Sequence, residues 1–527
     1  MSVIIPLLVL LPALAAALTL LAARQPPLQR FLAFFVLLAL VAMSVYLTVE
    51  IDRVGIHTVQ VGHWAAPWGI TLVVDRLSSL MLTVSSVVLF CVMWYAISQG
   101  IHDGGDDEPV AVFLPTYMLL TMGVNIAFVA GDLFNLYVGF EIFLVASYVL
   151  MTLGASASRV RAGISYVVIS MISSAIFLIG LAGVYAAVGT MNMAQVSERM
   201  EAVPGGTRAA IFGTLLVAFG IKAAIFPLDA WLPDSYPTAP SLVTAVFAGL
   251  LTKIGVYSII RMRATIFLDG IFDNLLMWVA LATMVVGILG AMAQNDIKRL
   301  LSFTLVSHTG YMIFGIGLGT AAGLAGAIFY AVHHILVQTS LFLVVGLIER
   351  QAGSASLRRL GSLMYSSPII AALFFLPAFN LGGIPPFSGF LGKIMLIEAA
   401  ASEGTALDWL LAAGAVATSL ITLYIMSLVW AKAFWRDRAD APEGELALAR
   451  PAPLVDVTDE VAFDDRIDPG RVPGGMILST SVLVAASLAI TFLAGPLAGM
   501  TTRAAGNAQD ASIYRSSVLD HHEEERH

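Results

Sequence analysis

The chain has 527 residues, of which 59% are hydrophobic and only 12% are charged. Soluble globular chains carry about 25% charged residues, so this composition indicates a polytopic membrane protein. The net charge of −8 is spread over loops and the C-terminal tail and gives no sign of a nucleic-acid partner. The single cysteine, Cys91, excludes an intrachain disulfide framework and a cysteine-based metal cluster. No P-loop or dinucleotide-binding glycine motif occurs, so we expect no cofactor.

Apolar runs of about 20 residues, the length that crosses a bilayer, recur along the chain. The first, at 2–23, has no basic region before it and is interpreted as a transmembrane helix rather than a signal peptide. The other predicted helices lie at 28–49, 77–99, 110–130, 133–154, 161–189, 208–238 (broken), 240–262, 274–294, 299–318, 321–349, 365–402 (broken), 408–434 and 474–496. The predicted fold class is therefore an all-α polytopic membrane protein with about fourteen transmembrane helices.

Two stretches look non-membranous. Residues 437–475 are rich in Pro, Asp and Glu, which is typical of a disordered or partner-contacting loop. Residues 504–527 end in HHEEERH and are predicted to form a mobile polar tail. The His521–His522 pair is expected to be solvated rather than to bind a metal.

Lysines and arginines predict the orientation, because cytoplasmic loops are enriched in them. With fourteen helices, one set of loops holds fifteen of these residues, the opposite set holds nine, and three lysines are left inside the membrane. The richer set includes the loop after 408–434. We therefore expect the richer set to be cytoplasmic, which places both termini of this multi-pass protein outside.

The rest of the chain is organised around residues 220–261, where Lys222 and Lys253 flank a run of prolines that begins at Pro227. A lysine within the hydrocarbon costs roughly 3 kcal/mol or more, so it marks a candidate functional site. Prolines at that depth free backbone carbonyls, which are tolerated only where protein or water surrounds them. This pattern is typical of an ion pathway.

A second broken helix lies at 380–393, where Pro385 and Pro386 are followed by Lys393. Lys222 precedes its proline and Lys393 follows its pair, which is the reversal that an inverted repeat produces. Paired, interrupted segments point to a transport site. We predict two inverted five-helix repeats, formed by helices 4–8 and 9–13. The predicted division of the chain is 1–109 (three helices and loops), 110–265 and 266–436 (the repeats), 437–473 (cytoplasmic loop) and 474–527 (last helix and tail).

Four further polar residues fall inside predicted membrane helices. Glu141 lies near the centre of 133–154, and a buried carboxylate there needs a partner, for which Lys222 is the natural candidate. A purely structural ion pair is the alternative. His308, His333 and His334 lie on two neighbouring helices, and adjacent residues face about 100° apart, so at most one of the last two should point into a shared pathway. Their spacing does not match a zinc motif, and we predict a polar relay.

Asp132 lies nine residues before the buried carboxylate and is expected at an exposed helix end. The other buried groups permit a proton relay, because movement of Glu141 toward or away from Lys222 changes the proton affinity of the lysine. The proton would then pass by Lys253 and the histidines to Lys393.

At these residues the chain resembles a known family, the antiporter-like membrane subunits shared by Mrp multisubunit Na+/H+ antiporters and respiratory complex I. The resemblance covers roughly residues 75–435 and is carried by FPLDAWLPDSYPTAP with its flanking lysines, NDIKRLLSFTLVSHTGYM, the HH-containing helix and GGIPPFSGFLGK. Residues 61–81 are most similar to D-type subunits of Mrp antiporters. Gln338 stands where several relatives carry a lysine.

The resemblance implies a fourteen-helix fold with two inverted repeats and proton-transfer roles for Glu141, Lys222, Lys253 and Lys393. It also implies a proton-translocating subunit of a Na+/H+ antiporter that works in the lipid bilayer with sister subunits and exchanges Na+ for H+, without being an enzyme. The alternative is a proton-pumping membrane subunit of an NADH:quinone oxidoreductase or a membrane hydrogenase.

Overall fold

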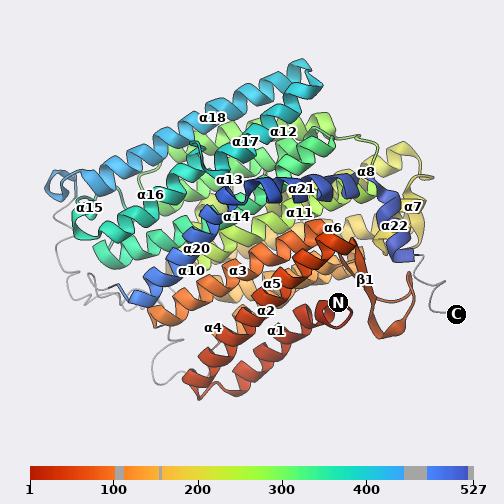
Figure 1. The fold of residues 1–527 in the computed structure, drawn as a ribbon, viewed down its shortest axis with the longest axis horizontal. Helices are drawn as coiled ribbons and strands as arrows, with labels where there is room; N and C mark the ends of the chain where they lie inside the picture. Colours follow the sequence, from red (N-terminus) through yellow and green to blue (C-terminus); the bar gives the residue numbers. More distant parts are fainter. Residues whose placement is uncertain (101–111, 154–156, 444–471, 520–527) are drawn as a thin grey trace.

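The computed structural model describes residues 1–100, 112–153, 157–443 and 472–519, and these are almost entirely helical (Figure 1). Twelve helices of the described part are long and apolar enough to cross a membrane. Two shorter apolar helices, α4 (Phe113–Val129) and α16 (Pro368–Gly382), occupy the positions of the fourth predicted segment and the first half of the twelfth. The all-α membrane fold is confirmed, whereas the count of fourteen spans stays a prediction.

The chain begins with three long helices that are interrupted by a small hairpin. Its elements are α1 (Ile4–Leu21), α2 (Pro26–Val54), β1 (His57–Gln60), the short turn η1 (Val61–His63), β2 (Thr71–Val74) and α3 (Arg76–Gln99). The strands are antiparallel, with His57 opposite Val74 and Gln60 opposite Thr71. Asp75 ends the hairpin and starts α3, because its carboxylate accepts a hydrogen bond from the Ser78 backbone N–H at 2.8 Å.

Two sets of five helical segments follow. The first set consists of α4, α5 (Leu133–Thr152), α6 (Ala157–Val188), α8 (Gly205–Ala223) with the short α9 (Leu232–Ser235) and η2 (Tyr236–Thr238), and the segment α10–η3–α11–η4 (Ser241–Val246, Phe247–Leu251, Thr252–Arg261, Met262–Ile266). A short helix, α7 (Met193–Met200), precedes α8.

The second set repeats this order. It consists of α12 (Asp273–Met292), α13 (Ile297–Gly317), α14 (Ala321–Ala352), α16 with α17 (Ser388–Glu403), and α18 (Ala406–Trp430) with η5 (Ala431–Trp435); the short α15 (Leu363–Ser366) precedes α16. In each set the first two helices pack along each other and the third packs on the broken one. This duplicated packing supports the predicted pair of repeats, while their boundaries stay predictions.

Both predicted helix breaks are present. The helix α8 ends at Ala223, and Ala224 takes a left-handed conformation with φ of 54° before the chain passes Pro227. The helix α16 ends at Gly382, Gly383 has φ of +80°, and α17 starts after Pro386. The lysine precedes the first break and follows the second, as the sequence predicts.

The C-terminal part corrects one prediction. It forms α20 (Gly474–Phe492), α21 (Ala494–Gln509) and α22 (Ala511–Leu519), and the tail predicted to be mobile from residue 504 is helical as far as Leu519. In Figure 1 the blue α21 runs across α14, with which it makes contact, and α22 packs on α7. This stretch was predicted to be mobile because its small and polar residues make the apolar face of the amphipathic helix hard to recognise. The His521–His522 pair lies outside the described residues.

The first residues of the predicted cytoplasmic loop are also ordered. A short turn, η6 (Arg438–Asp440), leads to Glu443, whose carboxylate pairs with Arg358 at 2.7 Å and Arg359 at 3.1 Å. The remainder of this loop, from 444 to 471, lies outside the described residues.

Loops that the predicted helix alternation places on the same side of the membrane lie together in the structure. Isolated β-bridges join Leu72 to Ala130 and Asp132 to Asn192 at one end of the bundle, and Asp296 to Ser356 at the other end. This pairing supports the alternation of the helices. It leaves the side that faces the cytoplasm as a prediction.

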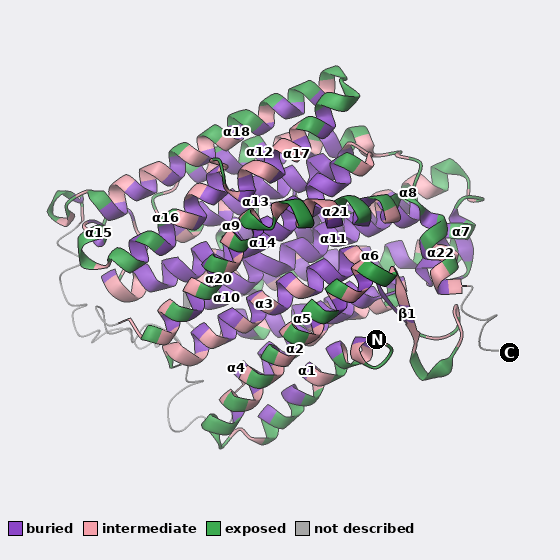
Figure 2. Ribbon diagram, viewed as in Figure 1, coloured by how far each residue is buried: buried purple, intermediate pink, exposed green. Residues whose placement is uncertain are grey.

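The centre of the bundle is the most buried region, as the purple ribbons of α11, α13 and α14 show in Figure 2. The apolar windows of α14 and of the α10–η4 segment are completely buried, whereas those of α1 and α2 are only 33% and 28% buried. The histidines and the middle lysine of the sequence therefore lie at the core of the protein, away from its lipid-facing rim.

Candidate functional site

Three lysines are buried inside the bundle, in agreement with the sequence analysis. Lys222, Lys253 and Lys393 are 7%, 0% and 5% exposed. The first lies in the last turn of α8, the second in the first turn of α11 and the third in the second turn of α17. Within the described residues, none of these ammonium groups has a carboxylate within 4 Å.

Lys222 is held by α6 rather than by the predicted carboxylate. Its Nζ donates to the Ser170 carbonyl oxygen at 3.1 Å and to the Ser174 hydroxyl at 3.4 Å. Glu141 is close enough to interact electrostatically with Lys222, but its Oε1 is buried without a hydrogen-bond partner in the described part of the chain. The direct ion pair expected from the sequence is thus absent in this conformation, because the lysine reaches a neighbouring helix instead.

Lys253 follows a widened turn of its helix. The π-helical segment η3 contains Ala248, whose carbonyl oxygen accepts a hydrogen bond from Lys253 Nζ at 2.7 Å, and the Thr252 hydroxyl is 3.2 Å away. Single π-helical turns inside α-helices are frequent at functional sites. Here the turn supplies the oxygen that the buried ammonium group needs.

The helices that carry the first two lysines are in close contact. A Cβ atom added to Gly255 would lie 2.7 Å from the Ala223 backbone nitrogen, so only glycine permits this approach. Ala223 is the neighbour of Lys222, and Gly255 is two residues after Lys253. The close packing that Gly255 permits therefore places both lysines beside the first helix break.

Lys393 lies against the end of α16 at the second break. Its Nζ donates to the Leu381 carbonyl oxygen at 3.0 Å, to the Gly382 carbonyl at 3.4 Å and to the Ser419 hydroxyl at 2.9 Å. The last carbonyls of a helix carry partial negative charge, which stabilises a nearby cation. The ammonium group also lies 5.2 Å from the centre of the Tyr311 ring.

His308 lies between the second and third lysines. Its Nδ1 is 2.6 Å from the Tyr330 hydroxyl and its Nε2 is 3.4 Å from the Thr422 hydroxyl. Lys253 and Lys393 both interact with it electrostatically. The ring is 5.3 Å from that of His334, centre to centre, so residues from α13 and α14 form one cluster.

The adjacent histidines of α14 face different neighbours. His333 Nδ1 contacts the Ser388 hydroxyl at 2.9 Å, at the start of α17, whereas His334 faces His308 and has no hydrogen-bond partner for either ring nitrogen within the described residues. Both rings nevertheless lie beside Tyr330, at 5.4 and 6.2 Å. Their divergence follows the predicted 100° rotation, and which of the two lies on a pathway stays a prediction.

Gln338 lies one turn beyond His334 on α14. Its side-chain amide donates to the Leu301 carbonyl oxygen at 2.8 Å, and its Oε1 has no partner in the described part of the chain. It is a buried polar residue on the same helix as the histidines.

Several polar residues of this cluster were missed by the sequence analysis. They are Tyr311, Tyr330, Asn380, Ser388, Ser419 and Thr422, all buried or half-buried around the histidines and Lys393. Tyr330 carried a usable signal, because it lies four residues before His334 and therefore on the same helix face. The others could not be recognised, because serine, threonine, asparagine and tyrosine also occur at ordinary packing positions.

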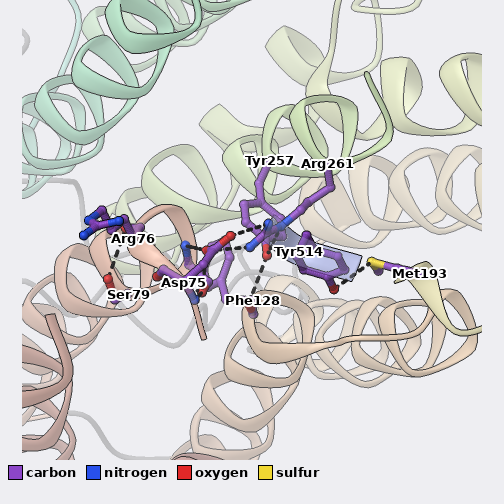
Figure 3. Close-up of polar contacts among 9 residues, drawn as sticks. Asp75, Arg76, Ser79, Phe128, Met193, Tyr257, Arg261 and Tyr514 are labelled. Carbon is purple, nitrogen blue, oxygen red and sulfur yellow. Dashed lines mark hydrogen bonds and ion pairs between the residues drawn. The ribbon is translucent and has the colours of Figure 1, made fainter. Parts of the chain in front are cut away.

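A second charged group was also missed. Figure 3 shows Asp75, at the start of α3, facing Arg261 of α11 in a bidentate ion pair with distances of 2.5 and 2.7 Å. Arg261 is one of the nine basic residues that were counted in the opposite set of loops, but it is only 3% exposed. Tyr257 accepts from its guanidinium at 2.9 Å, and the ring of Tyr514 from α22 covers it. Burial would raise the pKa of Asp75, but the Arg261 charge and the hydrogen bonds hold it below the ordinary value.

Asp132 likewise differs from its prediction. One carboxylate oxygen caps α5 by accepting from the Asn135 backbone N–H at 2.6 Å, whereas Oδ2 is buried and unpartnered among the described residues. Burial raises the pKa of Asp132 to about 6, against the effect of its backbone hydrogen bonds. The expected exposed residue is thus mostly covered, because the loop before α7 pairs with it.

The site shows no metal centre in the described part of the chain, where no group of three His, Cys, Asp or Glu side chains could hold an ion. Its chemistry is that of buried bases and hydroxyl groups. Such groups can accept, hold and release protons. In space they extend from the first helix break to the second.

Comparisons with known proteins agree with this geometry. The D subunit of the Na(+)/H(+) antiporter of Alkalihalophilus pseudofirmus is 36% identical over 98% of this chain and 99% of its own length. The protein of the same name from Bacillus subtilis is 34% identical over 84% of this chain and 88% of its own.

Solved structures give the same result. A chain of the Mrp complex from Dietzia sp. DQ12-45-1b superposes with a TM-score of 0.89 at 33% identity, covering 98% of this chain and all of that one. A chain of respiratory complex I from Thermus thermophilus shares the fold, with a TM-score of 0.77 at 23% identity over 98% of this chain and 99% of that one. The family described as NADH:quinone oxidoreductase/Mrp antiporter, TM, matches residues 130–422. This chain belongs to that family of antiporter-like membrane subunits.

Proposed function

We propose that this chain is the proton-translocating subunit of a multisubunit Na+/H+ antiporter, of the D type. The observation that carries the proposal is the row of three buried lysines, two of them at helix breaks, that have no carboxylate in contact among the described residues. A merely structural lysine would be paired, because a buried unpaired charge is costly. A lysine that binds and releases a proton must instead remain free to do both.

In this proposal Glu141 and Lys222 form the input switch. The lysine now bonds to Ser170, and a shift of α5 against α6 would bring the carboxylate to it and raise its proton affinity. Withdrawal of the carboxylate would release the proton toward Lys253.

The relay continues through the histidine cluster to the second break. His308 and His334 stand between Lys253 and Lys393, and His333 contacts the start of α17. Lys393 would release the proton at the far end. The prolines that interrupt the helices, Pro227, Pro385 and Pro386, keep backbone carbonyls available beside the outer lysines.

The partners of this protein are the sister subunits of an antiporter complex, the bilayer, Na+ and H+. Support comes from the relatives named as D subunits of Na(+)/H(+) antiporters and from the Mrp complex, which are more similar in sequence than the complex I chain is. We infer a bacterial cell-membrane location with both termini outside, and a transport role without catalysis. A redox-driven pump would use the same relay with a different energy source.

The test is Na+-dependent proton exchange by the whole complex in membrane vesicles. We expect Glu141→Ala and Lys253→Ala to abolish exchange although the complex assembles. Arg299→Ala is the matched control, because this arginine forms an exposed ion pair with Asp234. Wild-type exchange by well-assembled Glu141→Ala and Lys253→Ala complexes would contradict the proposal.

A further inference from the structure

Tyr330 lies at the meeting point of three helices that carry titratable groups. It is completely buried on α14, its ring stacks on His308 of α13 at 6.0 Å, and His333 and His334 follow it on its own helix. On the third helix, a Cβ at Gly392 would lie 2.9 Å from the tyrosine ring, so α17 touches it just before Lys393. Lys253 of α11 acts electrostatically on both His308 and His334.

The hydroxyl of Tyr330 contacts a titratable side chain, the imidazole ring of His308. Its oxygen lies 2.6 Å from His308 Nδ1, whereas the hydroxyls of Tyr117 and Tyr257 donate to the backbone carbonyls of Leu89 and Phe128. A backbone carbonyl cannot pass a proton onward. An imidazole ring can, because it accepts a proton at one nitrogen and releases one from the other.

The neighbouring bonds favour one tautomer of His308. Thr422 donates its hydroxyl hydrogen to the Thr418 carbonyl at 2.8 Å, so it can only accept from His308 Nε2. A neutral imidazole has one N–H, which this assigns to Nε2. His308 Nδ1 is therefore an acceptor, and the Tyr330 hydroxyl donates to it.

We propose that Tyr330 is a proton-carrying link between His334 and His308. When His334 is protonated, the Tyr330 O–H bond breaks as its proton moves to His308 Nδ1, and the phenol oxygen takes a proton from the His334 ring. His334 becomes neutral, His308 becomes the cation and Tyr330 ends neutral. A rotation of the His334 ring or one water molecule closes the remaining gap, since both His334 nitrogens lack hydrogen-bond partners among the described residues.

This link rests on the proposed function and supplies a step that the histidines alone do not make. His308 and His334 lie 5.3 Å apart between ring centres, and no hydrogen bond joins them in the described part of the chain. Tyr330 lies four residues before His334, on the same face of α14, and is already bonded to His308. It thereby connects the helix of the histidine pair with α13.

The experiment compares variants of the whole complex in vesicles by Na+-dependent proton exchange. Tyr330→Phe keeps the ring and removes the hydroxyl, and we expect the maximal rate to fall about tenfold or more with an unchanged half-saturating Na+ concentration. Tyr330→His restores a proton-carrying group and should recover part of the rate. Tyr117→Phe is the matched control, because its buried hydroxyl donates to a backbone carbonyl, and it should stay within about twofold of wild type.

A wild-type rate for Tyr330→Phe would overturn this link, and so would an equal loss in the Phe and His variants of an assembled complex. Lys253→Ala is measured beside them to separate the two proposals. If Lys253→Ala is inactive while Tyr330→Phe is active, only the role of Tyr330 fails. If Lys253→Ala exchanges normally, the proposed function itself fails.

Discussion

The Lys222 ammonium group lies 3.1 Å from the Ser170 carbonyl oxygen, a contact that ties the last turn of α8 to α6. Glu141 stands on α5, which also packs on α6, and its buried Oε1 has no partner among the described residues. In the proposed switch, a shift of α5 would exchange the carbonyl for the carboxylate, and two such arrangements are what a proton switch requires.

The second break depends on a close approach at Gly389. A Cβ there would overlap the Asn380 carbonyl oxygen and lie 3.0 Å from the His333 ring. We expect Gly389→Ala to displace α17 from α16 and to reduce proton exchange strongly. Gly206→Ala is the control, because a Cβ at Gly206 meets nothing within 4 Å. Equal exchange rates for the two variants in vesicles would show that this approach is dispensable.

The relay through α14 is expected to use His334 and not Gln338. The Gln338 amide bonds to the Leu301 carbonyl, so Gln338→Leu should cost about 1 kcal/mol of stability and leave most of the exchange activity. His334→Leu should abolish exchange. The measurement is the exchange rate of each assembled complex, and the reverse ranking of the two variants would refute this assignment.

The Asp75–Arg261 pair is expected to stabilise the bundle. Removing one partner leaves a buried charge without compensation, which costs about 3–5 kcal/mol. Asp75→Asn should therefore lower the Tm of the purified complex, and adding Arg261→Gln should restore part of the loss. A folded-state pKa below the ordinary value means that the pair is fully charged above about pH 4 and weakens only in stronger acid. An unchanged Tm for Asp75→Asn at pH 7 would show that the pair contributes nothing.

The buried carboxyl group of Asp132 should make stability depend on pH in the opposite direction. Its pKa of about 6 exceeds the ordinary 3.8, so folding disfavours its charged form, and the stability cost grows as pH rises from about 4 to 6. Asp132→Asn keeps an oxygen for the helix cap and removes the charge. We expect it to raise the Tm more at pH 8 than at pH 4.5, and the exposed Asp234→Asn variant is measured beside it for comparison. Equal shifts at both pH values would contradict this assignment.

Much of this arrangement could be predicted from the sequence because the signals are strong. Lysines in apolar helices and paired prolines have few interpretations in a membrane, and Lys222, Lys253 and Lys393 are buried where they were expected. The reversed order of lysine and break also appears in the structure. These features depend on local sequence and on the cost of burying charge.

The rest depends on contacts between distant segments. The pairing of Asp75 with Arg261 joins residues 186 positions apart, and nothing in either neighbourhood distinguishes Arg261 from a loop arginine. The helical tail was missed because its apolar face is short and becomes useful only against α7 and α14. The bond from Lys222 to Ser170 uses a backbone carbonyl, which no side-chain pattern reveals.

If Lys222 carries a proton, the Lys222→Arg variant should be inactive. Arginine keeps the positive charge and the hydrogen-bond donors but cannot release its proton. Na+-dependent proton exchange is measured in vesicles for the assembled wild-type, Lys222→Ala and Lys222→Arg complexes. Both variants are expected to lose exchange. Wild-type exchange by Lys222→Arg would contradict this role of Lys222, because a fixed positive charge would then be sufficient.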